Sequence, residues 1–399
     1  MKIVQINTVC GTGSTGKITV ALYELSKHYN YEPLIAYGRG DSPEHINGFK
    51  IGNKIDFYEH VLTNFFQGKS GFGSKRVTKK FLQWLDTVQP DILHLHNLHG
   101  FYINIEMLFD YIKRHNISVL WTFHDCWPIT GQCAYFDYAN CSKWKTGCYK
   151  CPIYRTSYPY SLFKDNSKEN YILKKEIFNN IENMIIVTPS NWLTNIVKES
   201  FLGKYPVKTI YNGIDLNTFK PMCQTATQPK ILLGVANVWT PQKGFSYFFK
   251  LAGMMDDSFQ LVLIGVSKKQ QKMLEKKYPN KIIGITRTNN QEELVQWYSK
   301  AYAFINPTLE DNFPTTNIEA LACGTPVITF NTGGSPESIN SSCGIVVEKG
   351  NVQQLKEAIL SLENNTEITS HSCFHQALNF DKNIKFPEYM KLYEELSHN

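Results

Sequence analysis

Short apolar runs recur along the 399-residue chain, and longer stretches with helical periodicity separate them. Short runs bounded by turn residues are typical of strands that are buried on both faces. Their alternation with helical stretches predicts parallel sheets covered by helices on both sides. The expected strands of the first half are Ile3–Ile6, Asp91–Leu95, Val119–Phe123, Met184–Val187 and Thr209–Tyr211. Those of the second half are Ile231–Val235, Gln260–Ile264, Lys281–Ile285, Ala303–Asn306 and Val327–Phe330.

A polar segment interrupts this alternation near the middle of the chain. Asn212 and Gly213 form a turn signal, and residues 222–229 are polar and lack periodicity. We therefore predict two α/β domains, each with a Rossmann-like doubly wound parallel sheet, that face each other across a cleft at the carboxyl ends of their strands. A final amphipathic segment is expected to pack back on one of them, with the N-terminal domain as the first choice. The predicted parts are residues 1–215, 229–380 and 381–399.

Composition agrees with a globular chain and excludes several classes of protein. Hydrophobic residues make up 42% and charged residues 19%, far from the composition of disordered chains. No apolar run reaches the length of a membrane-spanning helix, and the first residues lack the features of a signal peptide, so we expect a cytoplasmic protein. The formal net charge of +6 suits an anionic ligand or the inner face of a membrane. It falls short of the charge typical of nucleic-acid binding, so no nucleic acid is expected.

A loop rich in carboxylates and hydroxyls follows the expected strand Ala303–Asn306. It leads into a helical stretch that contains Glu319 and stops at Gly324. Backbone N–H groups at a helix N-terminus bind phosphate, and carboxylates accept hydrogen bonds from sugar hydroxyls. Glu319 is placed to hold a vicinal diol, as the acidic residue of a dinucleotide-binding fold holds ribose. Taken alone, these residues fit an ordinary loop and helix equally well.

The whole segment 306–326 resembles the nucleotide-sugar motif of the retaining glycosyltransferases of family 4, which have two Rossmann-like domains of the B-type glycosyltransferase fold. In that family two acids separated by seven residues contact the donor sugar and the ribose. Matching the second acid to Glu319 places the first at Asp311, with Glu310 beside it as an alternative. Pro314 stands where the family usually has glycine, and proline has no N–H to offer a donor. The donor contacts that the resemblance implies are Glu310, Asp311, Asn312, Phe313, Thr315, Thr316 and Glu319.

A lysine follows the first expected strand of the second half, in the loop that ends with Lys243 and Gly244. A lysine-glycine pair by itself indicates only a surface loop. At this distance from the acid motif, the resemblance implies that Lys243 stabilises the negative charge of a departing nucleoside diphosphate. The family usually has an arginine five residues earlier, where this chain has Val238. Arg287 is an alternative second cation.

A glycine-rich segment, residues 11–17, follows the first expected strand and precedes a helical stretch. It nearly satisfies the phosphate-binding pattern of P-loop proteins, but Ile18 stands where a magnesium-binding serine or threonine is required. An ATP-binding P-loop protein, with Asp125 holding the metal, is therefore an alternative hypothesis. We favour the interpretation in which the backbone at Gly13 approaches the donor, as the glycine loop of family 4 does.

His124 stands at the end of the expected strand Val119–Phe123 and is followed by Asp125. An isolated histidine at a strand end is more often structural than functional. The resemblance implies a position near the donor sugar for His124 and a role in orienting or stabilising the reacting centre, with Asp125 orienting its ring or meeting the acceptor. His94 and His96 alternate on another expected strand, where core packing is an equally good interpretation.

Four cysteines lie in or near the segment 126–152, which we interpret as a cysteine-rich insertion. They are Cys133, Cys141, Cys148 and Cys151. Four thiolates can close a tetrahedral structural zinc site that fixes a long loop. The irregular spacing leaves disulfides or four unlinked thiols as alternatives. Some family 4 enzymes carry a similar insertion, which implies structural rather than catalytic use.

Residues 75–85 form a stretch that is both basic and amphipathic. Lys75, Arg76, Lys79 and Lys80 alternate there with apolar residues. A basic amphipathic helix can rest on anionic lipid. The alternative is a helix whose apolar side covers the core.

These observations predict a retaining glycosyltransferase of the hexosyltransferase type, with His124, Lys243 and Asp311 as catalytic residues. It would use a nucleoside-diphosphate sugar and a saccharide or lipid-linked saccharide acceptor, as in the synthesis of surface polysaccharide or glycolipid. No cofactor is expected in the chemistry, and a peripheral membrane contact is expected. The alternatives are an ATP-binding protein, a nucleotide-sugar epimerase of the same fold and a non-catalytic sugar-binding protein.

Overall fold

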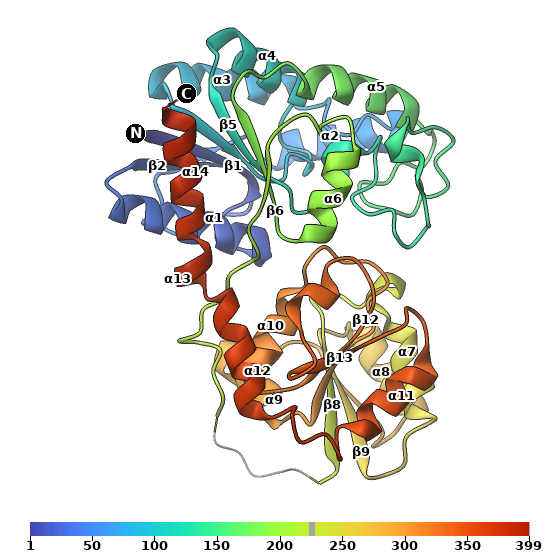
Figure 1. Ribbon diagram of the computed structural model, residues 1–399. Helices are drawn as coiled ribbons and strands as arrows, with labels where there is room; N and C mark the ends of the chain where they lie inside the picture. The colour runs from blue at the N-terminus through green and yellow to red at the C-terminus, as the bar shows by residue number, and fades with distance from the viewer. Residues whose placement is uncertain (223–227, 399) are drawn as a thin grey trace. The chain divides into compact units, whose positions relative to one another are not determined.

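The computed structural model of the chain describes residues 1–222 and 228–398. The chain forms two compact units, which are coloured along the sequence in Figure 1. Unit 1 comprises Met1–Ile210 together with the described residues from Phe386 onward, and unit 2 comprises Tyr211–Lys385. Each unit has one parallel sheet with helices on both faces. The predicted class, α/β with two doubly wound parallel sheets, is confirmed.

Unit 1 contains a seven-stranded sheet in which every pair of neighbours is parallel. Along the sheet the strands are β3 (Gly48–Lys50), β2 (Glu32–Arg39), β1 (Lys2–Val9), β4 (Ile92–Leu95), β5 (Ser118–Thr122), β6 (Met184–Thr188) and β7 (Val207–Thr209). The strand order reverses between β1 and β4. The apolar pattern missed β2, which contains Pro33 and Gly38, and missed the three-residue β3.

Alternate residues of the unit 1 strands face two separate helical layers, because successive side chains of a strand point to opposite faces. Val4 and Leu93 pack toward one layer and Ile3 and Ile92 toward the other. The helices on the first side are α3 (Lys75–Val88), α4 (Ile105–His115), α5 (Ser167–Phe178) and α6 (Asn191–Glu199). Those on the second side are α1 (Gly13–His28) and the C-terminal α14 (Pro387–Ser397), which lie side by side in Figure 1.

Unit 2 contains a six-stranded parallel sheet. Along the sheet the strands are β10 (Ile282–Ile285), β9 (Phe259–Ile264), β8 (Lys230–Val235), β11 (Ala303–Asn306), β12 (Val327–Phe330) and β13 (Gly344–Val347). The helices on one face are α7 (Phe245–Ala252), α8 (Lys268–Lys277) and α11 (Val352–Ser361). Those on the other are α9 (Gln291–Lys300), α10 (Thr315–Ala322) and α12 (Ser370–Ala377). All five strands expected in this half are present.

The observed division of the chain differs from the predicted boundaries by a few residues. Residues 211–215 were predicted to belong to the N-terminal domain, but they belong to unit 2. Ile214 N–H donates to the Phe380 carbonyl at 2.9 Å, and Lys382 Nζ lies 2.6 Å from the Asp215 carboxylate. The predicted linker lies partly outside the described residues. Of the final segment, α13 (Lys382–Lys385) belongs to unit 2 and α14 to unit 1.

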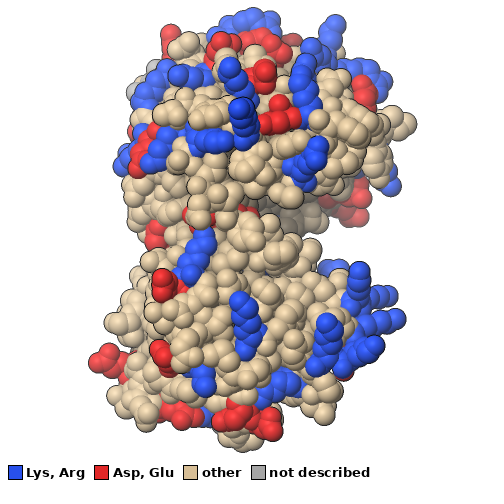
Figure 2. Space-filling model, turned by 90° about the vertical axis from the view of Figure 1, so that its right-hand side faces the viewer, with Lys and Arg blue, Asp and Glu red and all other residues tan. Residues whose placement is uncertain are grey.

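The surface carries charges of both signs. Figure 2 shows lysine and arginine side chains interspersed with aspartate and glutamate on both units. In the part of the chain that the structure describes, no helix is both long and apolar enough to cross a bilayer.

Candidate functional site

The candidate donor-site residues of unit 2 stand where the strand order reverses. β8 and β11 are neighbours in the sheet, and the chain leaves β8 toward α7 on one face and β11 toward α10 on the other. In open α/β sheets, ligands bind outside the carboxyl ends of the strands at such a point. The loop with Lys243 follows β8 and the loop with Asp311 follows β11, so the fold brings together two motifs that are far apart in the sequence.

Backbone contacts hold these two loops against each other. Leu309 N–H donates to the carbonyl of Gln242 at 2.7 Å. Gly244 adopts a left-handed φ of 77°, and a Cβ at this position would lie 2.0 Å from the carbonyl oxygen of Pro307. Only glycine allows this close approach. The position of Lys243 relative to the acid loop is therefore fixed by the backbone.

Lys243 and Asp311 form an ion pair within this site. The ammonium Nζ lies 2.6 Å from the Asp311 carboxylate Oδ2. The lysine side chain is 41% exposed and the aspartate side chain 15%. The pair thus places a solvent-accessible cation and a largely covered carboxylate at the same edge of the sheet.

A pair of glycines supports Asp311 from the loop after β12. Gly334 N–H donates to the Asp311 carbonyl at 3.3 Å. Gly333 has a φ of 55°, and a Cβ there would lie 1.8 Å from the same oxygen. The sequence analysis missed these two residues, although a double glycine after a buried strand is a signal for close backbone approach.

Glu319 lies on α10 and is oriented by a tyrosine from α9. The hydroxyl of Tyr298 donates to Glu319 Oε2 at 3.0 Å. Tyr298 is fully buried, and burial together with the Glu319 charge raises the pKa of its phenol well above the ordinary value, so it stays a donor. Tyr298 was not identified from the sequence, because nothing in its local pattern distinguishes it from a core aromatic residue.

The N-terminus of α10 faces the end of the acid loop without a side-chain cap. Pro314 occupies the N-cap position, and its side chain accepts no hydrogen bond from the first turn. Thr315 and Thr316 form that first turn and are partly exposed. Asn317 anchors the helix to β11, accepting a hydrogen bond from Asn306 Nδ2 at 2.7 Å. The positive end of the α10 dipole is therefore presented by the amides that the sequence analysis favoured.

Two of the predicted donor contacts have buried side chains. Phe313 is 3% exposed, and its ring packs on Tyr211 and Phe380 with centroid distances of 5.0 and 5.5 Å. Asn312 is also buried. The Phe313 ring thus packs in the core of unit 2. Arg287, the alternative second cation, lies in the loop after β10, which β9 and β8 separate from β11 in the sheet.

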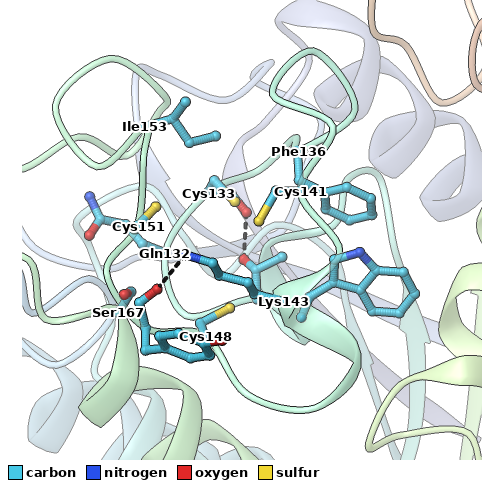
Figure 3. Close-up of a pocket in the computed structure, with 12 residues that line it drawn as sticks. Gln132, Cys133, Phe136, Cys141, Lys143, Cys148, Cys151, Ile153 and Ser167 are labelled. Atoms are coloured by element: carbon cyan, nitrogen blue, oxygen red, sulfur yellow. Dashed lines mark hydrogen bonds between the residues drawn. The ribbon is translucent and has the colours of Figure 1, made fainter.

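In unit 1 the four insertion cysteines gather around one small cavity, shown in Figure 3. The segment that carries them, between β5 and α5, contains only the short 3-10 helices η1 (Trp127–Ile129) and η2 (Lys143–Lys145). No disulfide joins the cysteines of the described ranges. Burial raises the pKa of the Cys148 thiol to about 11, and the neighbouring thiols of Cys141 and Cys151 add to that shift.

His124 lies directly beyond β5 and contacts a second histidine. Its Nε2 lies 3.0 Å from His96 Nδ1, and the two rings are stacked. Burial lowers the pKa of His124 to about 4, although the Asp125 charge opposes the shift. His124 is therefore a neutral imidazole at pH 7 that can donate or accept a hydrogen bond.

His94 and His96 are buried on β4 and the loop that follows it. His94 Nδ1 lies 2.7 Å from the Tyr393 hydroxyl of α14, and His94 Nε2 lies 2.8 Å from Thr122 Oγ1. Burial lowers the pKa of both histidines well below the ordinary value. Both are neutral members of the core.

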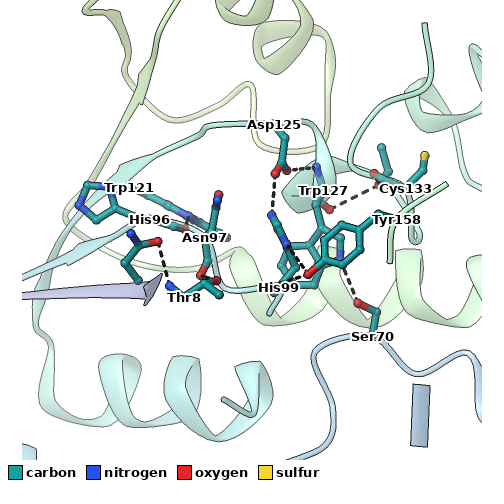
Figure 4. A network of polar contacts seen from close by, with 12 residues as sticks. Thr8, Ser70, His96, Asn97, His99, Trp121, Asp125, Trp127, Cys133 and Tyr158 are labelled. Carbon is teal, nitrogen blue, oxygen red and sulfur yellow. Dashed lines mark hydrogen bonds and ion pairs between the residues drawn. The ribbon is translucent and has the colours of Figure 1, made fainter. Parts of the chain in front are cut away.

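Asp125 forms its close contacts with residues other than His124, as Figure 4 shows. One carboxylate oxygen lies 2.6 Å from His99 Nε2, and the other accepts the Trp127 N–H at 2.8 Å. The His99 imidazole, which the sequence analysis missed, holds the pKa of Asp125 below its usual range despite burial. The carboxylate thus anchors the start of the insertion and pairs with His99.

The glycine-rich segment does not form the loop that a P-loop requires. β1 ends at Val9 and α1 begins at Gly13, so only three residues, Cys10–Thr12, connect them. Most of the pattern is helical and cannot wrap a phosphate with its amides. Gly13 has a φ of 64°, and its Cβ position meets no atom within 4 Å. The space beside its Cα is therefore open, and the approach of the Gly13 backbone to a donor stays a prediction.

The basic stretch at residues 75–85 forms α3, and its apolar side is buried. Val77, Phe81, Leu82 and Leu85 belong to the core of unit 1. Of the two interpretations, the structure therefore supports the helix whose apolar side covers the core. An exposed apolar face occurs instead on the preceding helix, α2 (Lys54–Gln67).

Two family models match the chain, one on each side of the linker. The model described as Glycosyltransferase Family 4 matches residues 25–218. The model described as Glycosyl transferases group 1 matches residues 223–383. Together they account for most of both units.

Curated relatives cover the same region. WcaC of Escherichia coli, named for a glycosyl transferase of colanic acid biosynthesis, is 24% identical over 379 residues, which is 89% of each chain. RfbU of Salmonella typhimurium, named an O-antigen chain mannosyltransferase, is 27% identical over 187 residues, 42% of this chain and 52% of its own.

Solved structures share the whole architecture. Sucrose-phosphate synthase of Thermosynechococcus elongatus has a TM-score of 0.73 and 14% identity over 99% of each chain. Anabaena HepE, solved in complex with UDP, has a TM-score of 0.66 and 14% identity over 99% of this chain and 100% of its own. At such identity the likeness shows the fold alone, with two parallel-sheet domains of the B type.

Proposed function

We propose, from the premise that the chain belongs to the family 4 glycosyltransferases, that it transfers a hexosyl group from a nucleoside-diphosphate sugar to an acceptor hydroxyl with retention. The glycosyltransferase class and a place in polysaccharide or glycolipid synthesis follow from the family models and the named relatives. The donor class, the retention and the residue roles are the proposal.

The observation that carries the proposal is the Lys243–Asp311 pair at the carboxyl ends of β8 and β11. The ammonium can turn from Asp311 to a diphosphate, because it stands on a long, flexible side chain that is 41% exposed. Negative charge grows on the diphosphate as it leaves, and a fixed cation stabilises that state more than the bound donor. The released Asp311 carboxylate, or that of Glu310 beside it, then accepts hydrogen bonds from sugar hydroxyls.

Glu319 is proposed to hold the ribose of the donor. A carboxylate offers about four acceptor positions, and the Tyr298 hydroxyl occupies one of them on Oε2. The orientation that this bond gives Glu319 suits the two donors of a vicinal diol. The amides of Thr315 and Thr316, at the start of α10, are proposed to bind the diphosphate.

His124 is proposed to act at the reacting centre as a neutral hydrogen-bonding group. A pKa near 4 excludes a standing imidazolium at neutral pH. The bond to His96 orients the ring from within unit 1. The Asp125 carboxylate is engaged by His99, so we assign it to positioning the local backbone instead of orienting His124.

A peripheral membrane contact for a lipid-linked acceptor is proposed on α2. Ile55, Tyr58, Leu62 and Phe66 recur at helical spacing and are between 54% and 74% exposed. Phe163 is 64% exposed and stacks on Phe66 with a centroid distance of 5.1 Å. Exposed Lys54, Lys69 and Lys164 flank this apolar face. Apolar side chains with basic neighbours suit the anionic inner face of a bilayer.

Nucleotide titration of variants tests the donor site. We expect Lys243→Ala and Glu319→Ala each to weaken binding of the preferred nucleoside diphosphate at least tenfold, since each removes a charged hydrogen-bonding partner. Lys277→Ala on α8, an exposed lysine outside the site, is the matched control and should bind as the unaltered chain does. Unchanged affinity in both site variants would contradict the assignments.

Turnover assays separate the remaining alternatives. A transferase consumes the donor only when an acceptor is present, whereas a nucleotide-sugar epimerase consumes it without one. A sugar-binding protein binds the donor and leaves it intact. ATP binding that is lost in Lys17→Ala would revive the P-loop hypothesis.

A further inference from the structure

The four insertion cysteines converge although they lie on separate turns. Cys133 follows η1, Cys141 precedes η2, and Cys148 and Cys151 follow it. All four line one cavity of about 20 Å³, and Figure 3 shows the side chains of Cys133 and Cys141 next to each other in it. A cavity of this size holds a single water-sized sphere. The fold thus gathers four sulfur ligands around a space that suits one ion.

The cysteines lie in a long segment without regular structure. Between the end of β5 at Thr122 and the start of α5 at Ser167, only two short 3-10 helices occur. Long loops of this kind in a compact domain are uncommon unless something holds them. No disulfide does so among the described residues.

Two backbone hydrogen bonds fix cysteines at the edge of the cavity. Gly131 N–H donates to Cys148 Sγ at 3.2 Å. The Cys151 N–H donates to the Asp165 carboxylate at 2.7 Å, which fixes the backbone of that cysteine. Such bonds orient ligands, as the groups behind the ligands of metal sites do.

A buried lysine supplies an independent observation. Lys174 on α5 is fully buried, and its ammonium donates to the carbonyls of Trp127 and Thr130 at 2.8 and 3.1 Å. It pairs with no carboxylate at ion-pair distance within residues 1–222 and 228–398, and the groups whose negative charge would stabilise it are Cys133, Cys148 and Asp125. Asp125 already pairs with His99. A buried ammonium needs a compensating charge nearby.

We infer that Cys133, Cys141, Cys148 and Cys151 bind one Zn²⁺ as thiolates in a closed tetrahedral site that fixes the insertion. Each thiol gives up its proton to solvent on binding. Four thiolates around one divalent ion carry a net negative charge, and the Lys174 ammonium offsets part of it. With four protein ligands no position is open to substrate, so the role is structural.

Side-chain rotation is required to close the site. In the described ranges, no three cysteine, histidine or acidic side chains stand at the spacing of a completed metal cluster. The backbone already places all four cysteines around the same cavity, so the rotation concerns the side chains. Neutral thiols have no strong attraction for one another, so they need not point to a common centre. Thiolates do, because each is attracted to the same cation.

Metal analysis of the full-length chain, purified under reducing conditions, tests the inference. We expect one zinc per chain, and X-ray absorption should show four sulfur neighbours at about 2.3 Å. Cys133→Ser and Cys148→Ser should each lose most of the zinc. Cys373→Ser, a buried cysteine of unit 2 on α12, is the matched control and should keep it.

Three outcomes would overturn the inference. They are a chain without zinc whose four thiols react freely, a mass deficit that indicates disulfides among these cysteines, and full zinc in both site variants. If the site variants fail to fold, the zinc content and the X-ray absorption of the unaltered chain decide the question alone. Since the readout is metal content, it is independent of donor binding.

Discussion

The hydroxyl of Tyr298 donates to Glu319 Oε2 across the gap between α9 and α10. Burial and the Glu319 charge raise the pKa of that phenol well above its ordinary value, so the hydroxyl remains a hydrogen-bond donor. The residue proposed to hold the ribose is therefore oriented by a partner 21 positions away in the sequence.

Tyr298→Phe should raise the KM for the nucleotide-sugar donor about tenfold and leave kcat within about threefold. The variant keeps the ring in the core and removes only the donor to Glu319, a bond to a charged group worth about 1.5–3 kcal/mol. Steady-state kinetics at varied donor concentration measure the effect. Tyr302→Phe is the control, because the Tyr302 hydroxyl is buried without a hydrogen-bond partner in the described structure. Equal kinetics for the two variants would contradict the prediction.

Gly333→Ala should destabilise unit 2 by about 2–4 kcal/mol and reduce donor affinity. The new Cβ would collide with the Asp311 carbonyl, and alanine is strained at a φ of 55°. Denaturant unfolding and nucleotide titration measure the two effects. Gly253→Ala is the control, because its φ is −75° and its Cβ would meet no atom closer than 3.5 Å. A Gly333→Ala protein with unchanged stability would show that the loop adjusts freely.

The double variant Leu62→Gln, Phe66→Gln should bind anionic vesicles at least tenfold more weakly than the unaltered chain. Each side chain contributes about 1.5–3 kcal/mol when it is fully buried in an apolar phase. Co-sedimentation with vesicles of anionic and neutral lipid measures the effect. Leu360→Gln on α11, an exposed leucine of unit 2, should bind normally. If the double variant binds as well as this control, the α2 face is not the contact.

Unfolding free energy should fall as the pH drops below about 6.5, partly because of His60. Burial lowers the pKa of this histidine to about 4 in the folded chain. The unfolded chain then binds more protons between about pH 6.5 and 4, so His60 removes up to about 1.4 kcal/mol of stability per pH unit in that window.

His60→Gln tests the origin of this slope. His60 Nε2 accepts the Gly73 N–H at 3.2 Å, and the glutamine amide oxygen can take over that role without titrating. Denaturant unfolding from pH 7 to 4.5 should show a smaller slope of the unfolding free energy against pH. The decrease should correspond to about one proton fewer taken up on unfolding. If the slope is unchanged, the loss of stability at low pH comes from the other buried histidines.

The sequence predicts the fold well where the apolar runs are unbroken. Five of the six strands of unit 2 follow from their runs, and only β13 was not expected. The Lys243 and Asp311 motifs fall where the strand order reverses, because the fold places strand ends there. β2 was not predicted, because Pro33 and Gly38 interrupt its apolar run.

Contacts between residues far apart in the chain could not be predicted from the sequence. His99 meets Asp125, and Gly333 approaches Asp311, only after the sheets have formed. An amphipathic pattern also fails to say which side is covered. The periodicity of α3 fitted either a helix on lipid or a helix over the core. The structure buries the apolar side of α3, and an exposed apolar face is on α2.

The return of α14 to unit 1 sets an order of assembly during synthesis. Ile3, at the very start of the chain, shares its hydrophobic cluster with Tyr393, and His94 bonds to the hydroxyl of the same tyrosine. Unit 1 is thus completed only after unit 2 has been synthesised, since one face of its sheet lacks part of its apolar cover until α14 emerges. Chains truncated before Phe386 should therefore aggregate through a surface that the finished protein never exposes.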